Sequence, residues 1–144
     1  MRRSSQVLLA VVIAGVAIQL YPIERGNPPV RFEVDAPQMV VEVLRNACYD
    51  CHSSETHWPW YGYVAPVSWL IAHDVKEARG HFSFSDWSAV ENEARLLDEI
   101  WEEVEGGGMP PAIYALMHSK ARLSDEQMRL IREWTQPERQ DEGH

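Results

Sequence analysis

Apolar residues recur at helical spacing along most of the chain, in segments separated by stretches rich in proline and glycine. This spacing predicts helices over residues 36–47, 67–79, 87–105 and 125–135, with a short helical piece at 113–118. Recurrence every three or four residues places apolar side chains on one face, as a helix that packs on a core requires. No pattern of strands alternating with helices is present. We therefore predict an all-α fold.

Three of these helices are preceded by residues of the types that cap helix N-termini. Asp35 is the predicted N-cap of the first helix, and Ser85 or Asp86 is the predicted N-cap of the third. Ser124 and Gln127 have the spacing of a capping box, in which each side chain bonds the other residue's backbone N–H. The last helix is therefore predicted to begin just after Ser124.

The N-terminal 23 residues have the layout of an export signal. Arg2 and Arg3 precede an apolar run that begins at Val7. The run is near the lower length limit for a membrane span, and small residues at 15–17 offer a cleavage site. We expect the domain on the periplasmic side, anchored to the inner membrane by residues 7–23. The alternative is a soluble periplasmic protein after signal cleavage.

The rest of the chain divides by composition into three parts. Residues 24–34 contain prolines and a glycine with little apolar periodicity, which predicts a linker between the signal or anchor segment (1–23) and the domain. Residues 35–136 hold the predicted helices, and residues 137–144 are predicted to form a flexible, charged tail. A length of 144 residues suits a single domain with one modest core.

Composition and charge narrow the classes of partner. Hydrophobic residues make up 45% of the chain, an ordinary fraction for a globular protein. The formal net charge is −9, which gives nucleic-acid binding no electrostatic basis. An acidic surface favours a basic partner protein, chiefly by raising the association rate.

The candidate chemistry is concentrated in the motif Cys48-x-x-Cys51-His52. Two cysteines three residues apart, followed at once by histidine, are the attachment motif of a c-type haem. On a helix these positions lie on one face, so both thiols can reach the two haem vinyl groups. His52 would then offer a ring nitrogen to the iron as proximal ligand. Because the chain has only these two cysteines, we predict one covalent haem c.

Two other uses of the cysteines stay open at this point. Cys48 and Cys51 could form a redox disulfide, although such pairs usually stand near a strand–helix–strand pattern that this chain lacks. They could also form half of a zinc site with His52 or His57. Structural zinc sites usually have a second, separated ligand pair, and the sequence offers no clean one.

A second candidate ligand to the iron is Met109, which follows three glycines and precedes two prolines. Glycines end a helix and allow close backbone approach, and a thioether opposite histidine is the cytochrome c arrangement. His118 is the main alternative as distal ligand, and His81, His57 and an open sixth position are further ones. A methionine in this setting can also simply fill a gap in a core.

Residues 57–63 form an aromatic loop close to the motif. Its rings could line one edge of the haem, and the Trp and Tyr N–H and O–H groups could bond a propionate. Ordinary core packing is the alternative, and an aromatic ligand platform is a third.

The order of these features resembles a class I cytochrome c: a helix entering the Cys-x-x-Cys-His motif, a glycine-rich Met-Pro loop and a capped C-terminal helix. More closely, the chain is similar to the bacterial haem-binding domain family, over residues 47–53, 58–61, 65–69, 84–87 and 109–124. The family comprises exported or membrane-anchored single-haem proteins. The resemblance implies a cytochrome c-like helical domain around one haem, held through Cys48, Cys51 and His52.

For the function we expect a single-haem electron carrier with iron bound by His52 and Met109, because such an iron changes oxidation state with little rearrangement. A basic redox protein is the expected partner. The alternatives are a haem-based sensor or peroxidase-like enzyme with an opening distal site, and an accessory haem domain of a larger exported complex.

Overall fold

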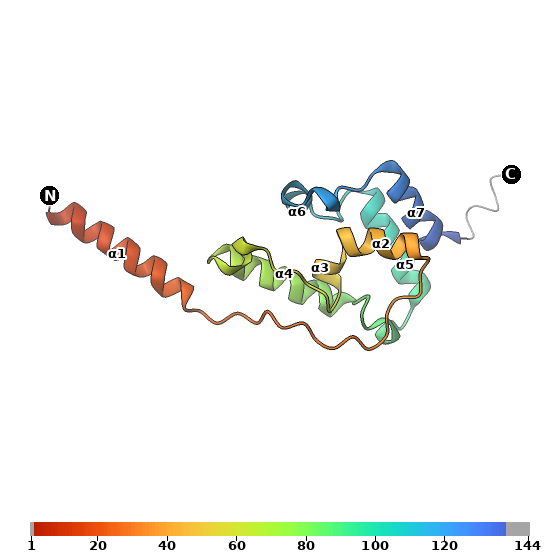
Figure 1. The fold of residues 1–144 in the computed structure, drawn as a ribbon, viewed down its shortest axis with the longest axis horizontal. Helices are drawn as coiled ribbons and strands as arrows, with labels where there is room; N and C mark the ends of the chain where they lie inside the picture. The colour runs from red at the N-terminus through yellow and green to blue at the C-terminus, as the bar shows by residue number, and fades with distance from the viewer. Residues whose placement is uncertain (1, 138–144) are drawn as a thin grey trace.

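The computed structural model describes residues 2–137, and Figure 1 shows how the helices are arranged. The α-helices are α1 (Arg2–Gln19), α2 (Gln38–Ala47), α3 (Tyr49–His52), α4 (Val67–His81), α5 (Glu93–Glu105), α6 (Ala112–Met117) and α7 (Asp125–Thr135). Short 3-10 helices are η1 (Trp60–Tyr63), η2 (Trp87–Ala89) and η3 (Ser119–Ala121). The one β pairing in residues 2–137 is an isolated bridge between Phe32 and Asp86. The predicted all-α class is therefore confirmed for the described chain.

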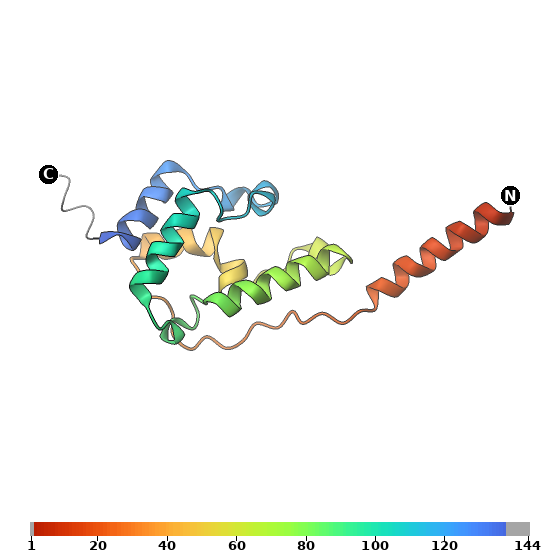
Figure 2. The same ribbon diagram turned by 180° about the vertical axis from the view of Figure 1, so that it is seen from behind.

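The core lies where α2, α5 and α7 meet. Each helix turns its apolar stripe inwards, and Leu44 of α2 and Ile131 of α7 are completely buried. Tyr49 stacks on Phe84 with ring centroids 5.2 Å apart, which extends the core to α3. Figure 2 shows that α4 and α6 both project from the same side of this core. The short helix α3 lies at the base of α4, so the core directly supports the Cys-x-x-Cys-His turn.

The predicted N-cap of the first core helix is wrong. α2 begins at Gln38, and Pro37 occupies the N-cap position without a side-chain bond to the helix. Asp35 lies two residues too early because the chain before the helix is still extended, with the Val34 N–H donating to the Phe84 carbonyl at 2.8 Å. A tertiary contact has therefore overridden the local cap preference.

The helix predicted over residues 87–105 is divided in two. η2 covers its beginning, and α5 starts only at Glu93. Asn92 is the N-cap, with its side-chain oxygen accepting from the Arg95 N–H at 3.1 Å. Neither Ser85 nor Asp86 caps this helix. Asn, Ser and Asp are comparable N-caps, so cap preference alone did not select among them.

The capping box of the last helix is confirmed. Ser124 Oγ accepts from the Gln127 N–H at 3.3 Å, and Gln127 Oε1 accepts from the Ser124 N–H at 2.9 Å. Both bonds satisfy backbone donors that the first turn of α7 leaves free.

Residues 24–34, which we call the strap, lie extended along the domain (Figure 1). At one end, the Arg25 guanidinium donates to the Gly62 carbonyl at 3.1 Å. At the other end, the bridge at Phe32 and the Val34 bond fix the strap to the segment that follows α4. The segment predicted as a linker is thus bonded to the domain at both ends.

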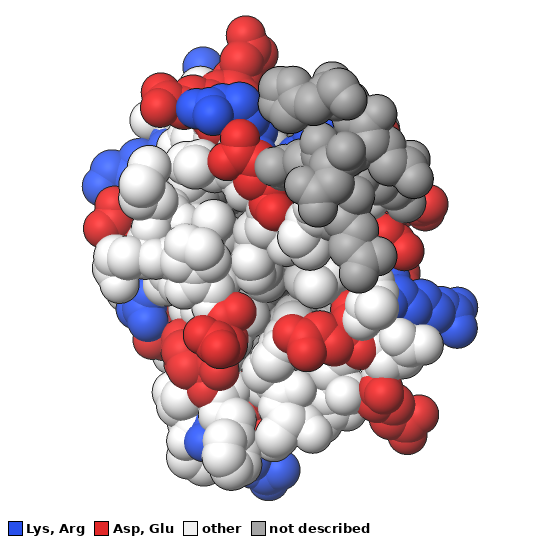
Figure 3. Space-filling view, turned by 90° about the vertical axis from the view of Figure 1, so that its right-hand side faces the viewer, with Lys and Arg blue, Asp and Glu red and all other residues white. Residues whose placement is uncertain are grey.

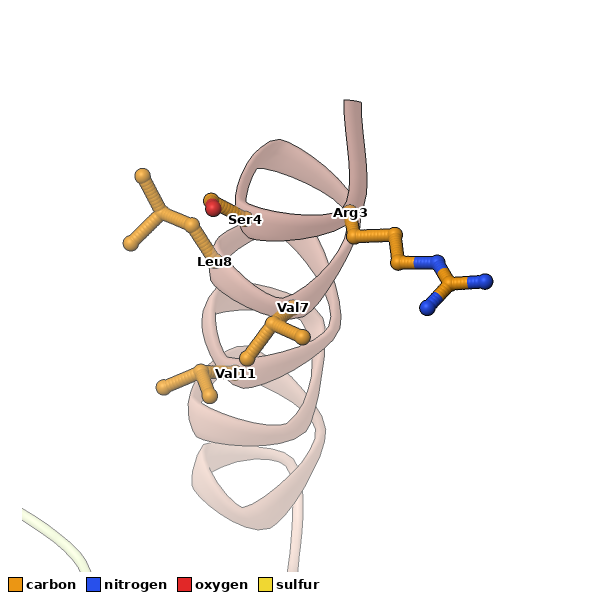
Figure 4. Close-up of a pocket in the computed structure, with 5 residues that line it drawn as sticks. All are labelled: Arg3, Ser4, Val7, Leu8 and Val11. Atoms are coloured by element: carbon orange, nitrogen blue, oxygen red, sulfur yellow. The ribbon is translucent and has the colours of Figure 1, made fainter. Parts of the chain in front are cut away.

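The N-terminal helix α1 stands apart from the core in both ribbon views. Its apolar side chains are exposed, from 38% at Ile18 to 66% at Leu8. A shallow hollow on it is lined by α1 side chains alone, and Figure 4 shows these side chains projecting from that one helix. In residues 2–137, no helix combines the length and the hydropathy needed to cross a bilayer. The membrane anchor therefore stays a prediction.

Acidic side chains dominate the net charge of −9. On the face drawn in Figure 3 they gather at several places around a central area without charged groups. The exposed residues of α5 include several glutamates, and this helix has no basic residue in its last turn.

Candidate haem-attachment site

The motif residues lie where the chain turns from α2 into α3. The Cys48 N–H donates to Leu44 of α2 at 2.7 Å. The Cys48 carbonyl then accepts from the N–H groups of Cys51 at 3.2 Å and His52 at 2.9 Å. These bonds place both thiols and the imidazole on a single helical turn.

Both cysteines are free and half-buried. Burial, with a smaller contribution from Cys51, raises the pKa of the Cys48 thiol to about 12. Burial and the nearby charges of Asp50 and Asp74 raise the pKa of the Cys51 thiol to about 11. The thiols are therefore protonated at neutral pH. Reactive redox cysteines have a lowered thiol pKa, so these surroundings do not favour the redox-disulfide alternative.

His52 is buried, with 9% of its surface exposed. Its ring stacks on Phe82 with centroids 4.2 Å apart, and Nδ1 lies 3.5 Å from the Phe82 carbonyl oxygen. Burial lowers the pKa of the imidazole to about 4, so the ring is neutral at pH 7. Iron binds the neutral ring, and a carbonyl on one nitrogen directs the other nitrogen to the metal.

These residues fit a c-type haem. Two free thiols and a neutral imidazole share one turn, and the Phe82 carbonyl beside Nδ1 would leave the other ring nitrogen for iron. In residues 2–137, no three His, Cys, Asp or Glu side chains are grouped so that they could hold a metal ion by themselves. A porphyrin supplies four of the iron's ligands, so one or two protein ligands suffice.

Arg79 of α4 binds the segment that follows the motif to the strap. Its guanidinium donates to the Ser53 carbonyl at 2.8 Å and to Thr56 Oγ1 at 2.7 Å. The same group donates to Gly26 O at 3.0 Å and to Asn27 Oδ1 at 2.6 Å in the strap. One cation therefore joins three segments beside the attachment turn. Sequence patterns did not indicate this role, because all the partners of Arg79 are loop residues far from it in the chain.

Asp50, inside the motif, is a second residue that sequence reasoning missed. Its Oδ2 accepts from the Tyr114 hydroxyl at 2.6 Å, and its Oδ1 accepts from the His57 N–H at 2.9 Å. The Asp50 carbonyl accepts from Thr56 Oγ1 at 2.7 Å. An open pocket of about 600 Å³ lies here, with Asp50, Tyr114 and His118 in its walls. No local signal marks Asp50, since its key partner lies 64 residues later.

Met109 lies in the loop between α5 and α6. Its side chain is 39% exposed, and its N–H donates to the Glu103 carbonyl at 3.0 Å. Gly107 has φ of 73°, which glycine adopts without strain, and the Gly108 N–H also donates to the Glu103 carbonyl, at 2.8 Å. This turn and these bonds fold the loop onto the end of α5. The structure leaves the thioether accessible to a ligand, and Met109 as distal ligand stays a prediction.

The alternative histidine ligands have other partners. His118 Nε2 lies 3.2 Å from the Tyr61 hydroxyl, and its Nδ1 lies 3.2 Å from the Tyr114 carbonyl. His81 Nε2 lies 2.9 Å from Glu99 Oε1 on the surface. His57 is exposed and lies beside the carboxylate of Asp50.

The rings of the aromatic loop point in different directions. Trp58 is half-buried and donates its indole N–H to the Arg25 carbonyl of the strap at 3.0 Å. Trp60 is 78% exposed and Tyr63 is 52% exposed. Tyr61 turns the other way, to His118. The loop thus packs partly on the strap, and its contact with a haem edge stays a prediction.

Comparison of the sequence with known proteins identifies its family. No curated protein and no solved structure matches the chain significantly. The profile of the haem-binding domain family matches residues 13–137, which include the attachment turn, the aromatic loop and the Met109 loop. A haem cofactor is therefore supported by the match as well as by the site. The chain belongs to the haem-binding domain family.

Proposed function

We propose that this haem-binding protein holds one haem c, attached through Cys48 and Cys51, with His52 as proximal ligand. The observation that carries the proposal is the attachment turn itself. Two protonated thiols stand on the same turn as a neutral imidazole whose Nδ1 faces a backbone carbonyl. Each thiol would add its S–H across a haem vinyl group, forming a C–S bond and placing the proton on the adjacent carbon, with no oxidant required.

The haem, when bound, supplies a one-electron redox centre. Met109 is the proposed distal ligand, because it is accessible and is held by a folded glycine loop. His52 is held by stacking and by a carbonyl, so its ring needs little movement between oxidation states. A proximal ligand held by an aromatic ring and a carbonyl suits an electron carrier, which is the function we propose.

A second candidate function has one observation in its favour. The Met109 side chain is 39% exposed, so packing does not fix it in one position. A displaceable methionine would open the sixth position to a small ligand, as a sensor or a peroxidase-like enzyme needs. Rapid binding of carbon monoxide by the ferrous protein would favour this second function over electron transfer.

The proposed location is the periplasmic side of the inner membrane, with residues 7–23 as the anchor, or the periplasm after signal cleavage. The exposed apolar side chains of α1 support this location, since nothing else in the described chain covers them. The acidic surface supports a basic redox protein as partner.

The test of the electron-carrier proposal is the absorption spectrum of the ferric, haem-loaded protein. We expect a methionine-to-iron charge-transfer band that disappears in Met109→Ala. Met39→Ala is the matched control, because Met39 is 58% exposed on α2 and is not a candidate ligand. A spectrum that is unchanged by Met109→Ala would remove Met109 from the iron.

A further inference from the structure

Asp50 is fixed by hydrogen bonds to nearby residues as well as by its bond to Tyr114. One carboxylate oxygen accepts from the His57 N–H at 2.9 Å, and the Asp50 carbonyl accepts from Thr56 at 2.7 Å. Its side chain is only 23% exposed. The other carboxylate oxygen accepts from the Tyr114 hydroxyl at 2.6 Å. The attachment turn therefore presents a fixed acceptor to α6.

α6 has few other contacts with the rest of the domain, and one of them is the bond between Tyr61 and His118 at its C-terminal end. None of its six residues is buried, and Ile113 and Leu116 are 72% and 65% exposed. Its N-cap, Pro111, makes no side-chain bond to the helix. Arg122 donates to the Ala115 carbonyl at 2.9 Å, which ties α6 only to the segment that follows it. Apolar burial cannot position this helix, so its polar contacts must.

The Tyr114–Asp50 bond is of the strong kind. It is a short O–H···O⁻ bond to a charged acceptor, and such bonds are about twice as strong as neutral ones. Burial, followed by the bond to Asp50, raises the pKa of the Tyr114 hydroxyl, so the donor proton stays in place. The Tyr114 ring also stacks on His118 with centroids 4.2 Å apart.

Both candidate distal ligands are at the ends of α6. Met109 is joined to it by two prolines, whose fixed φ angles leave little freedom between the thioether and the helix. His118 follows its last turn and is bonded to Tyr61 at 3.2 Å. A shift of α6 would therefore move both ligands relative to the attachment turn.

We propose that Asp50 is a positioning residue that holds α6 on the haem-attachment turn through Tyr114, and thereby sets which side chain stands as the distal ligand. The part concerning the ligand rests on the proposed function. The part concerning α6 does not, because it depends only on contacts within the chain.

The test uses three variants of the full-length chain as purified. Tyr114→Phe removes the donor and keeps the ring that stacks on His118. Asp50→Asn keeps an acceptor but removes its charge. Tyr63→Phe is the matched control, because it removes a hydroxyl from a ring that is 52% exposed in η1. Two quantities are measured on each: amide hydrogen exchange in α6, and the charge-transfer band of the ferric haem.

We expect the α6 amides to exchange about 10- to 100-fold faster in Tyr114→Phe, as loss of a hydrogen bond to a charged group implies. Asp50→Asn should lie between this variant and the wild type, and Tyr63→Phe should match the wild type. The charge-transfer band should weaken in the same order. Unchanged α6 exchange in Tyr114→Phe would overturn the proposal.

The measurements distinguish failure of the claim about α6 from failure of the claim about the distal ligand. Faster α6 exchange with a full charge-transfer band in Tyr114→Phe would overturn the claim that α6 sets the ligand. A wild-type spectrum without the band would reject Met109 as ligand, which belongs to the proposed function, while the exchange rates would still decide whether Asp50 holds α6.

Discussion

Phe82 holds the His52 ring in two ways at once. The two rings stack with centroids 4.2 Å and planes 17° apart, and the Phe82 carbonyl oxygen lies 3.5 Å from Nδ1 of the imidazole. Stacking fixes the tilt of the ring, and the carbonyl fixes its rotation. The ligand is therefore pre-oriented by a residue 30 positions later in the chain.

Truncating this partner should loosen the ligand and destabilise the domain. Phe82→Ala keeps the carbonyl but removes the stacked ring, which is half-buried. We expect the free energy of unfolding to fall by about 2 kcal/mol, below the usual cost for a fully buried phenylalanine. Denaturant unfolding measures this loss. Phe32→Ala is the control, because that side chain is 63% exposed, and an equal loss in both variants would contradict the account.

Replacing Arg79 should free the strap. Arg79→Met removes bonds to Ser53, Thr56 and both strap residues, Gly26 and Asn27. Bonds to charged groups contribute about 1.5–3 kcal/mol each and are not additive, so we expect a total loss of about 2–3 kcal/mol.

The measurement for Arg79→Met is limited digestion with trypsin, which cleaves after arginine. Cleavage after Arg25 and Arg31 should become faster, because both lie in the strap. Lys76→Met is the control on the same helix, at an exposed position. Strap cleavage at the wild-type rate in Arg79→Met would show that the strap does not depend on this arginine.

The haem-free chain should lose stability as the pH falls from about 6.5 to about 4. Burial lowers the pKa of His52 from 6.5 to about 4 in the folded state. Between these values the unfolded chain binds more protons, so unfolding becomes more favourable, by about 3 kcal/mol once the pH is below both values.

Urea unfolding across this pH range checks that effect. His52→Phe should flatten the dependence, whereas His73→Phe, at an exposed position on α4, should leave it in place. An equally steep dependence in His52→Phe would assign the effect to other groups.

Local sequence signals predicted much of the helical framework. The α7 boundaries and the Ser124–Gln127 capping box were correct, because that signal lies within four residues. The starts of α2 and α5 were wrong. Before α2, the bond from Val34 to Phe84 keeps the chain extended past the expected cap. Cap preference describes a single residue and carries no information about a partner 50 positions away.

At the candidate site too, local sequence signals predicted the motif turn but not the distant residues that hold it. The Cys-x-x-Cys-His spacing indicated a turn that carries two thiols and an imidazole, and the structure places them on one turn. The partners that fix this turn were not predictable. Phe82, Arg79 and Tyr114 belong to other elements, and only the folded chain brings them to the motif.

Covalent haem attachment at Cys48 and Cys51 is tested by the mass of the intact, denatured polypeptide. The chain is produced in a host that attaches c-type haem, then unfolded and separated from free haem. We predict a polypeptide heavier by one haem, and a bare polypeptide for Cys48→Ala combined with Cys51→Ala. A wild-type polypeptide that releases all its haem on unfolding would contradict the account.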